Sequence, residues 1–75
     1  MIDIYSKVDC GYCKAAKDLL NVNNINYNEY VIGRDLTREE FFEKFPNMKT
    51  VPVILVDGNI IGGYDKLLEH VSKKD

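Results

Sequence analysis

The chain of 75 residues is short enough to hold one compact domain, because a second hydrophobic core would not fit within it. Hydrophobic residues make up 45% and charged residues 29% of the sequence, a balance too apolar for intrinsic disorder. The formal net charge of -2 and the scattered lysines offer no broad cationic surface for nucleic acid. No apolar run approaches the roughly 18 residues of a membrane span, and the first residues lack a secretory signal pattern. We therefore expect one domain over residues 1–75, monomeric and cytoplasmic, bound to neither nucleic acid nor membrane.

The first half of the chain predicts two strands joined by a helix. Ile2 and Ile4 alternate with polar residues, which indicates a strand over residues 2–6. Apolar residues then recur at helical spacing over residues 11–22. Residues 27–32 are rich in aromatic and β-branched side chains and predict a second strand. Because a βαβ unit joins parallel strands, these two strands should pair in parallel.

The second half predicts a helix, a hairpin and a closing helix. Thr37 and Glu40 have the spacing of a capping box, so a helix should follow Thr37 and run to about residue 45. Residues 53–56 form the most strand-like run of the chain. Asp57 and Gly58 then suit a two-residue hairpin turn, with residues 59–61 as the antiparallel return strand. The closing helix is marked by one apolar face: Tyr64, Leu67, Leu68 and Val71.

Two groups of apolar residues are expected in the core of the domain. They are the three phenylalanines at positions 41, 42 and 45, and the face of the closing helix at positions 67, 68 and 71. The final residues, Lys73, Lys74 and Asp75, are expected to form a frayed end.

The two cysteines are the most informative residues for chemistry, because Cys10 and Cys13 form a C-x-x-C motif between the first strand and the first helix. A bridge that closes so short a loop removes little entropy from the unfolded chain, so a structural disulfide is a poor explanation. A thiol attacks a disulfide as its thiolate, and the free amides and dipole of a helix start stabilise negative charge. We therefore predict that Cys10 is the exposed nucleophile and that Cys13, one turn into the helix, is the resolving thiol.

Two charged neighbours of Cys10 act in opposite directions. Lys7 brings positive charge towards the sulfur, whereas the carboxylate of Asp9 disfavours a thiolate. Asp9 has a second interpretation as a helix cap, which would partly offset this repulsion, and the sequence leaves both open. A zinc site needs about four ligands, and the two cysteines with the distant His70 do not supply them, so no metal site within the chain is expected.

Three motifs in register resemble the glutaredoxin family, and the resemblance covers nearly the whole chain. Tyr5-Ser6-Lys7 precedes the cysteine motif, Thr50-Val51-Pro52 precedes the third strand, and Gly62-Gly63-Tyr64-Asp65 precedes the last helix. The resemblance implies an α/β, thioredoxin-like fold, in which a four-stranded mixed sheet is flanked by three helices in the order β-α-β-α-β-β-α. It also implies a thiol-disulfide oxidoreductase that uses glutathione as its co-substrate.

By this resemblance, glutathione binds beside the cysteines in an extended form. Val51 would pair its backbone with the cysteinyl unit, and Pro52 would be a cis proline. The amides that follow Gly63 would hold the γ-glutamyl carboxylate, while Asp65 would accept hydrogen bonds from the ammonium group. Lys7 would pair with the glycyl carboxylate. The predicted glutathione site comprises Lys7, Tyr12, Thr50, Val51, Pro52, Gly63, Tyr64 and Asp65, with Lys49 as a further candidate.

The chain departs from the commonest family pattern at three positions, and two alternative functions stay open. Gly11 stands where many dithiol members have proline, Asp9 is atypical, and Lys66 occupies a position that is often acidic. In some relatives a non-proline residue at the first of these positions accompanies a [2Fe–2S] cluster shared between two protomers. Cys10 would then ligate the cluster in a dimeric cluster carrier. The second alternative is a hydrogen donor recycled by thioredoxin reductase for an enzyme such as ribonucleotide reductase. The main expectation remains glutathione-dependent reduction of protein disulfides and protein–glutathione mixed disulfides.

Overall fold

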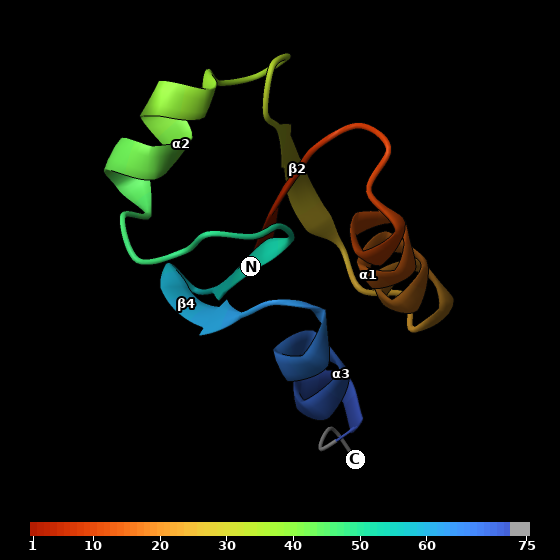
Figure 1. Ribbon diagram of the computed structural model, residues 1–75. Coiled ribbons are helices and arrows are strands. Elements are labelled where there is room, and N and C mark those ends of the chain that lie inside the picture. Colours follow the sequence, from red (N-terminus) through yellow and green to blue (C-terminus); the bar gives the residue numbers. More distant parts are fainter. Residues whose placement is uncertain (73–75) are drawn as a thin grey trace.

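The computed structural model describes residues 1–72, which form a four-stranded mixed sheet with helices on both faces (Figure 1). The elements in chain order are β1 (Ile2–Ser6), α1 (Gly11–Val22), β2 (Tyr27–Val31), α2 (Arg38–Lys44), β3 (Val53–Val56), β4 (Asn59–Gly62) and α3 (Tyr64–Ser72). The predicted order of elements and the thioredoxin-like fold class are confirmed. The prediction of a frayed end at positions 73–75 lies outside the described residues.

The strands lie in the order β2-β1-β3-β4. β1 and β2 pair in parallel, with Ile4 opposite Glu29, as the crossover through α1 requires. β3 is antiparallel to both β1 and β4. Asp57 and Gly58 have φ values of 51° and 84°, the positive values that a tight hairpin turn needs. The predicted parallel pair and the predicted hairpin are therefore both confirmed.

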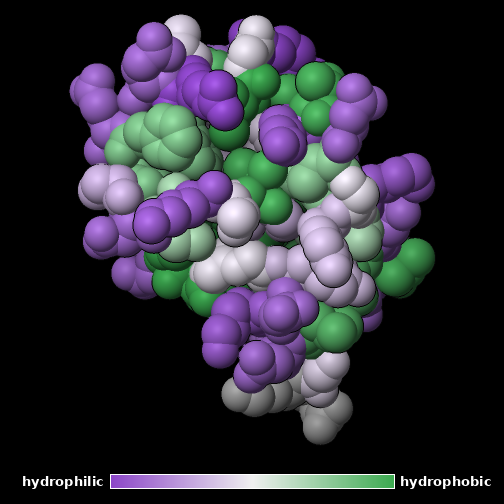
Figure 2. Space-filling model, viewed as in Figure 1, coloured by the Kyte–Doolittle hydropathy of each residue, from purple (hydrophilic) through white to green (hydrophobic). Residues whose placement is uncertain are grey.

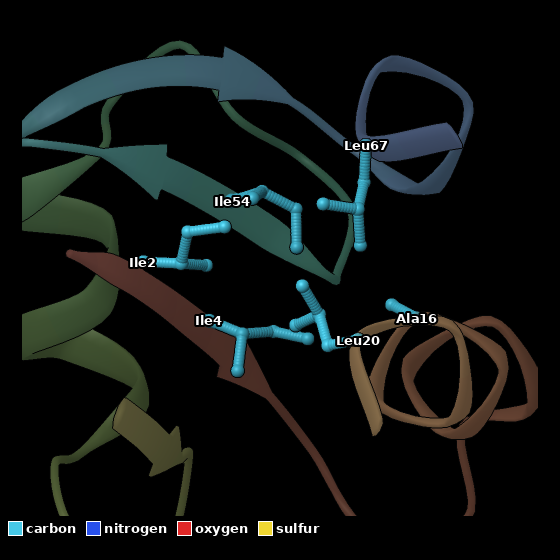
Figure 3. Packing of buried hydrophobic residues seen from close by; sticks show 6 residues of the cluster. All are labelled: Ile2, Ile4, Ala16, Leu20, Ile54 and Leu67. Carbon is cyan, nitrogen blue, oxygen red and sulfur yellow. The ribbon is translucent and has the colours of Figure 1, made fainter. Parts of the chain in front are cut away.

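The core is divided between the two faces of the sheet. On one face, α1 and α3 pack on the sheet through a cluster drawn in Figure 3: Ile2, Ile4, Ala16, Leu20, Ile54 and Leu67. On the opposite face, α2 packs through Phe41 and Phe45 against Tyr5 and β3. The rings of Tyr5 and Phe45 meet edge to face with their centroids 4.8 Å apart, a favourable aromatic geometry. Apolar residues one turn apart thus anchor the buried side of α2.

Two residues that were expected in the core lie largely at the surface. Phe42 is 45% exposed and Leu68 is 42% exposed. Successive residues of a helix are rotated by about 100°, so both side chains turn away from the sheet when their neighbours Phe41 and Leu67 face it. The core prediction was therefore wrong for Phe42 and Leu68.

A capping box starts α2, as the sequence predicted. The Thr37 hydroxyl accepts a hydrogen bond from the backbone N–H of Glu40 at 3.0 Å, and the Glu40 carboxylate accepts one from the backbone N–H of Thr37 at 2.7 Å. We expect Thr37→Ala to lower the free energy of unfolding by about 1 kcal/mol in urea denaturation, because a helix-start amide loses its acceptor. Thr37→Ser keeps an acceptor and should lose much less. Equal losses in the two variants would show that the hydroxyl is not the source of this stability.

Polar and apolar side chains are interspersed over the face of the molecule seen in Figure 2. The longest helix among residues 1–72, α1, has 12 residues, whereas a membrane-spanning helix needs about 20. Within residues 1–72, no helix is both long and apolar enough to cross a membrane.

Three loops meet at one end of the sheet. Because β1 and β3 are antiparallel, with Tyr5 opposite Val53, the end of β1 lies beside the start of β3. Ile54 is opposite Gly62, so the end of β4 lies there as well. The cysteine loop, the segment before β3 and the turn before α3 therefore converge, although they are far apart in the sequence.

Candidate active site

Cys10 occupies the N-cap position of α1. Its backbone is extended, and its Sγ accepts a hydrogen bond from the backbone N–H of Cys13 at 3.2 Å. On the other side, its thiol donates a weak hydrogen bond to the carbonyl oxygen of Val51, 3.9 Å away. Free amides at a helix start point towards an anion, so this position suits a sulfur that must react as a thiolate. Cys10 is also partly exposed, which leaves its sulfur open to a substrate.

Asp9 does not cap α1, because Cys10 itself is the N-cap residue. Asp9 instead has a φ of 58°, in the left-handed region that few non-glycine residues adopt. This turn of the backbone brings Cys10 to the start of the helix, and the Asp9 side chain stays at the surface. The capping interpretation of Asp9 was therefore wrong.

Cys13 lies in an environment quite unlike that of Cys10. It is only 1% exposed, and both cysteines are free thiols. Burial above all, followed by the neighbouring sulfur of Cys10, raises the pKa of the Cys13 thiol to about 12. One thiol is thus accessible and the other shielded, which fits the predicted order of attack.

A groove of about 1010 Å³ opens beside Cys10 and is lined by residues of all three converging loops. Nine of the ten residues that the sequence analysis placed in the site line this groove: Lys7, Cys10, Tyr12, Thr50, Val51, Pro52, Gly63, Tyr64 and Asp65. The tenth, Cys13, lines a separate cavity of about 770 Å³, to which Cys10 also contributes. Cys10 therefore stands at the boundary between two cavities.

The walls of the groove come from two loops and one pair of rings. The peptide bond between Val51 and Pro52 is cis, as predicted. The rings of Tyr12 and Tyr64 lie with their centroids 6.0 Å apart and their planes tilted by 39°. A Cβ atom on Gly63 would lie 3.4 Å from the carbonyl oxygen of Pro52, an ordinary van der Waals distance, so these two loops lie side by side at this wall of the groove.

Cationic side chains outnumber carboxylates along the groove. Four cations and two carboxylates line it: Lys7, Arg38, Lys49 and Lys66, with Asp9 and Asp65. The groove is therefore locally positive, although the whole chain carries a formal charge of -2. Such a surface attracts an anionic ligand towards Cys10.

Four residues that line the groove had no predicted part in the site: Ile32, Arg38, Phe42 and Lys66. Arg38 is the first residue of α2, where the helix dipole disfavours a cation. A cation at this unfavourable position was the only feature of the sequence that could have indicated a role for Arg38 outside α2. Phe42 is exposed on α2 because it belongs to the wall of the groove rather than to the core.

Across residues 1–72, no three or more side chains of His, Cys, Asp and Glu gather around one point where they could hold a metal ion. A [2Fe–2S] cluster needs four protein or thiol ligands. The described residues of one chain do not supply them, so a cluster at Cys10 would depend on ligands from elsewhere.

Gly11, the first residue of α1, has nothing within 4 Å of the position that its Cβ would take. Proline suits the first helical position, and the extended backbone of Cys10 is compatible with a following proline. We expect Gly11→Pro to raise the free energy of unfolding of the reduced protein by about 0.5 kcal/mol in urea denaturation, by restricting the unfolded chain. Gly33→Pro is the matched control and should destabilise the fold, because Gly33 has a φ of 95° and donates its N–H to Leu36. Destabilisation by both prolines would contradict the open space seen at Gly11.

Comparison with known proteins identifies the family. The family model described as Glutaredoxin matches residues 2–61. The chain is 38% identical over 66 residues to an uncharacterized glutaredoxin-like 8.6 kDa protein in the rubredoxin operon of Clostridium pasteurianum, with 88% of each chain covered. The crystal structure of glutaredoxin 1 from Francisella tularensis complexed with cacodylate has a TM-score of 0.83 and 30% identity, over 96% of this chain and 92% of that one. The buckwheat glutaredoxin–glutathione complex has a TM-score of 0.78 and 27% identity, over 97% and 70%. With the free cysteine pair at the start of α1, these matches show that the chain belongs to the glutaredoxin family of thiol-disulfide oxidoreductases.

Proposed function

We propose that the protein is a glutathione-dependent oxidoreductase that reduces protein disulfides and protein–glutathione mixed disulfides. The cationic groove beside Cys10 is the observation that carries this proposal. Glutathione has two carboxylates and one ammonium group at neutral pH, so its net charge is opposite to that of the groove. The buckwheat relative was solved as a complex with glutathione, which supports the same class of ligand here.

In this proposal glutathione lies extended along the groove with its sulfur at Cys10. The Val51 backbone, whose carbonyl lies beside the Cys10 sulfur, pairs with the cysteinyl unit. The amides at the start of α3 hold the γ-glutamyl carboxylate, and Asp65 accepts from the γ-glutamyl ammonium group. Lys7 and Arg38 attract the glycyl carboxylate. The ammonium group and the glycyl carboxylate of glutathione thus meet side chains of opposite charge, and the γ-glutamyl carboxylate meets free backbone amides.

The reaction is a pair of thiol-disulfide exchanges. The Cys10 thiolate attacks one sulfur of the substrate disulfide, a mixed disulfide forms at Cys10, and the other sulfur leaves as a thiolate that takes up a proton. When the mixed disulfide at Cys10 holds glutathione, a second glutathione attacks the glutathione-derived sulfur, which forms glutathione disulfide and releases the Cys10 thiolate. Alternatively, Cys13 attacks the Cys10 sulfur and releases the second half of the substrate as a thiolate that takes up a proton. When Cys13 attacks, two molecules of glutathione reduce the resulting Cys10–Cys13 disulfide and become glutathione disulfide.

We place this reaction in the cytoplasm of the cell, with the protein acting as a monomer. The cysteines must return to free thiols after each cycle, and the cytoplasm maintains the reducing glutathione pool that does this. Glutathionylated proteins are the natural substrates for a groove of this kind. Disulfide-forming enzymes such as ribonucleotide reductase are the second class of substrate.

The test is turnover of a glutathione mixed disulfide in two parallel coupled assays. One assay couples glutathione reductase and NADPH to glutathione, and the other supplies thioredoxin reductase and NADPH without glutathione. Turnover confined to the glutathione assay supports the proposal. Turnover confined to the thioredoxin reductase assay would keep the cysteine chemistry and overturn the glutathione site. No turnover in either assay, together with visible absorbance after anaerobic reconstitution with iron and sulfide, would overturn the proposal and identify the protein as a cluster carrier.

A further inference from the structure

A polar network lies between α1 and the sheet, in the second cavity. One carboxylate oxygen of Glu29 accepts a hydrogen bond from the Lys17 ammonium at 2.8 Å and another from the Ser6 hydroxyl at 3.1 Å. Ser6 is 1% exposed, and the side chains of Lys17 and Glu29 are 32% and 26% exposed. Cys13 lines the same cavity as these three residues. The network is therefore next to the shielded thiol rather than next to the groove.

The fold places the Lys17 ammonium on the side of Cys13. Lys17 follows Cys13 by four residues on α1, so their side chains share one face of the helix. The hydrogen bond to Glu29 is the main cause that raises the pKa of Lys17, and the same bond lowers the pKa of Glu29. Both groups are thus charged at neutral pH, and the ion pair fixes where the ammonium lies.

Cys13 must lose its proton before it can attack a mixed disulfide at Cys10. The pKa of Cys13 is raised to about 12 by burial and by Cys10, whereas the backbone N–H of Lys7 and the Lys17 ammonium lower it. Once Cys10 is part of a neutral mixed disulfide, its negative charge no longer opposes a Cys13 thiolate. The charged residues lining the cavity are Lys7, Asp9, Lys14, Lys17, Glu29 and Arg34. Of the cations in this list, Lys17 is the one that shares the helix face of Cys13, and its charge lowers the pKa of that thiol.

We propose that Lys17 is a positioning residue for the resolving step: held by Glu29, which Ser6 in turn fixes, its ammonium stabilises the Cys13 thiolate as it forms. The inference rests on the proposed role of Cys13 as the resolving thiol. In this step a Cys13–Cys10 bond forms while the bond from Cys10 to the substrate sulfur breaks, and the electron pair leaves with the substrate sulfur. The Cys13 proton passes to solvent and the departing thiolate takes up a proton, so no further oxidant or reductant is needed.

The test separates the two thiols of the reduced full-length protein by their reaction with dithiobis(nitrobenzoic acid). Attack by Cys10 releases one coloured thiolate, and attack by Cys13 on the resulting mixed disulfide releases a second. Stopped-flow absorbance over a range of pH therefore gives a rate profile for each step. We expect Lys17→Met to slow the second release about tenfold at neutral pH and to move its profile up by about one pH unit, while the first release is unchanged.

Two further lysine variants serve as rescue and control. Lys17→Arg keeps a cation that can bond Glu29, so it should restore most of the rate and the profile of the second release. Lys14→Met removes an exposed lysine of the same helix, which pairs with Asp18 at 3.2 Å, and should leave both releases unchanged. A second release that is equally slow in Lys17→Met and Lys17→Arg would overturn the proposal.

Glu29→Gln distinguishes electrostatics from packing. The amide can still hold Lys17, but the carboxylate that opposes a thiolate is gone, so the profile of the second release should move to lower pH. A shift to higher pH in both Glu29→Gln and Lys17→Met would mean that the variants act by loosening α1, which would refute the proposal.

Cys13→Ser distinguishes a failure of the resolving role of Cys13 from a failure of the role of Lys17. A persistent second release in Cys13→Ser would refute the resolving role of Cys13, whereas its loss there with wild-type behaviour of Lys17→Met would refute only the role of Lys17.

Discussion

Replacing Cys10 with serine is expected to lower the rate of both glutathione mixed-disulfide reduction and protein-disulfide reduction by at least about a thousandfold. A serine hydroxyl stays protonated at neutral pH and does not form the mixed disulfide on which both reactions depend. Cys10 is also the cysteine that lines the groove, whereas Cys13 is 1% exposed. The measurement is turnover in the glutathione reductase assay and with a protein disulfide substrate, after circular dichroism has shown that the variant is folded.

The companion variant, Cys13→Ser, should affect glutathione mixed-disulfide reduction and protein-disulfide reduction differently. Glutathione can resolve the mixed disulfide at Cys10 without Cys13, so deglutathionylation should persist, while reduction of a protein disulfide by the dithiol route should be lost. Full activity of Cys10→Ser would show that the assignment of the nucleophile is wrong. Loss of both activities in a folded Cys13→Ser protein would show that Cys13 has a role beyond resolution.

Leu67→Ala is expected to lower the free energy of unfolding by about 3 kcal/mol, through lost burial and the cavity that is left. Leu67 is 0% exposed and joins α3 to the cluster formed by α1 and the sheet (Figure 3). A domain of this size has a total stability of roughly 4 to 11 kcal/mol, so the loss removes a large share of it. Urea denaturation of the reduced protein measures the change.

Leu68→Ala is the matched control, because it makes the same substitution one position along the same helix. Leu68 is 42% exposed, so its truncation should change the free energy of unfolding by much less. Similar losses in the two variants would contradict the division of α3 into a buried and an exposed side.

The elements were predictable because local chemistry marks them individually. The capping box at Thr37 and the turn at Asp57 specify an element boundary within a few residues of sequence. Which apolar residue faces the core was harder to predict, as Phe42 shows. Hydrophobicity alone does not tell two adjacent helical residues apart, and only the packing of α2 on Tyr5 decides between Phe41 and Phe42.

In the candidate site, too, the residues marked by a local motif could be predicted from the sequence, whereas those placed by tertiary contacts could not. The cysteine motif and the loop ending at Pro52 were visible in the sequence, and the structure brings both to one groove. The contact of Lys17 with Glu29 was missed, because it joins α1 to β2 and depends on the register of the parallel pair. Arg38 was missed for a similar reason, since its place beside the groove follows from how α2 sits on the sheet. Contacts between distant elements become predictable only once the tertiary arrangement is known.

The convergence of three loops at one end of the sheet ties ligand binding to the integrity of the whole domain. The cysteine loop follows β1, whereas the loop ending at Pro52 and the turn at Gly63 belong to the later hairpin. A fragment ending at α2 would therefore retain both thiols and part of the groove, including Lys7 and Arg38, but would lose the walls that the loop ending at Pro52 and the turn at Gly63 supply. Conversely, a ligand that bridges the three loops binds only the fully assembled chain. At a concentration one hundred times its dissociation constant, it would raise the free energy of unfolding by about 2.7 kcal/mol.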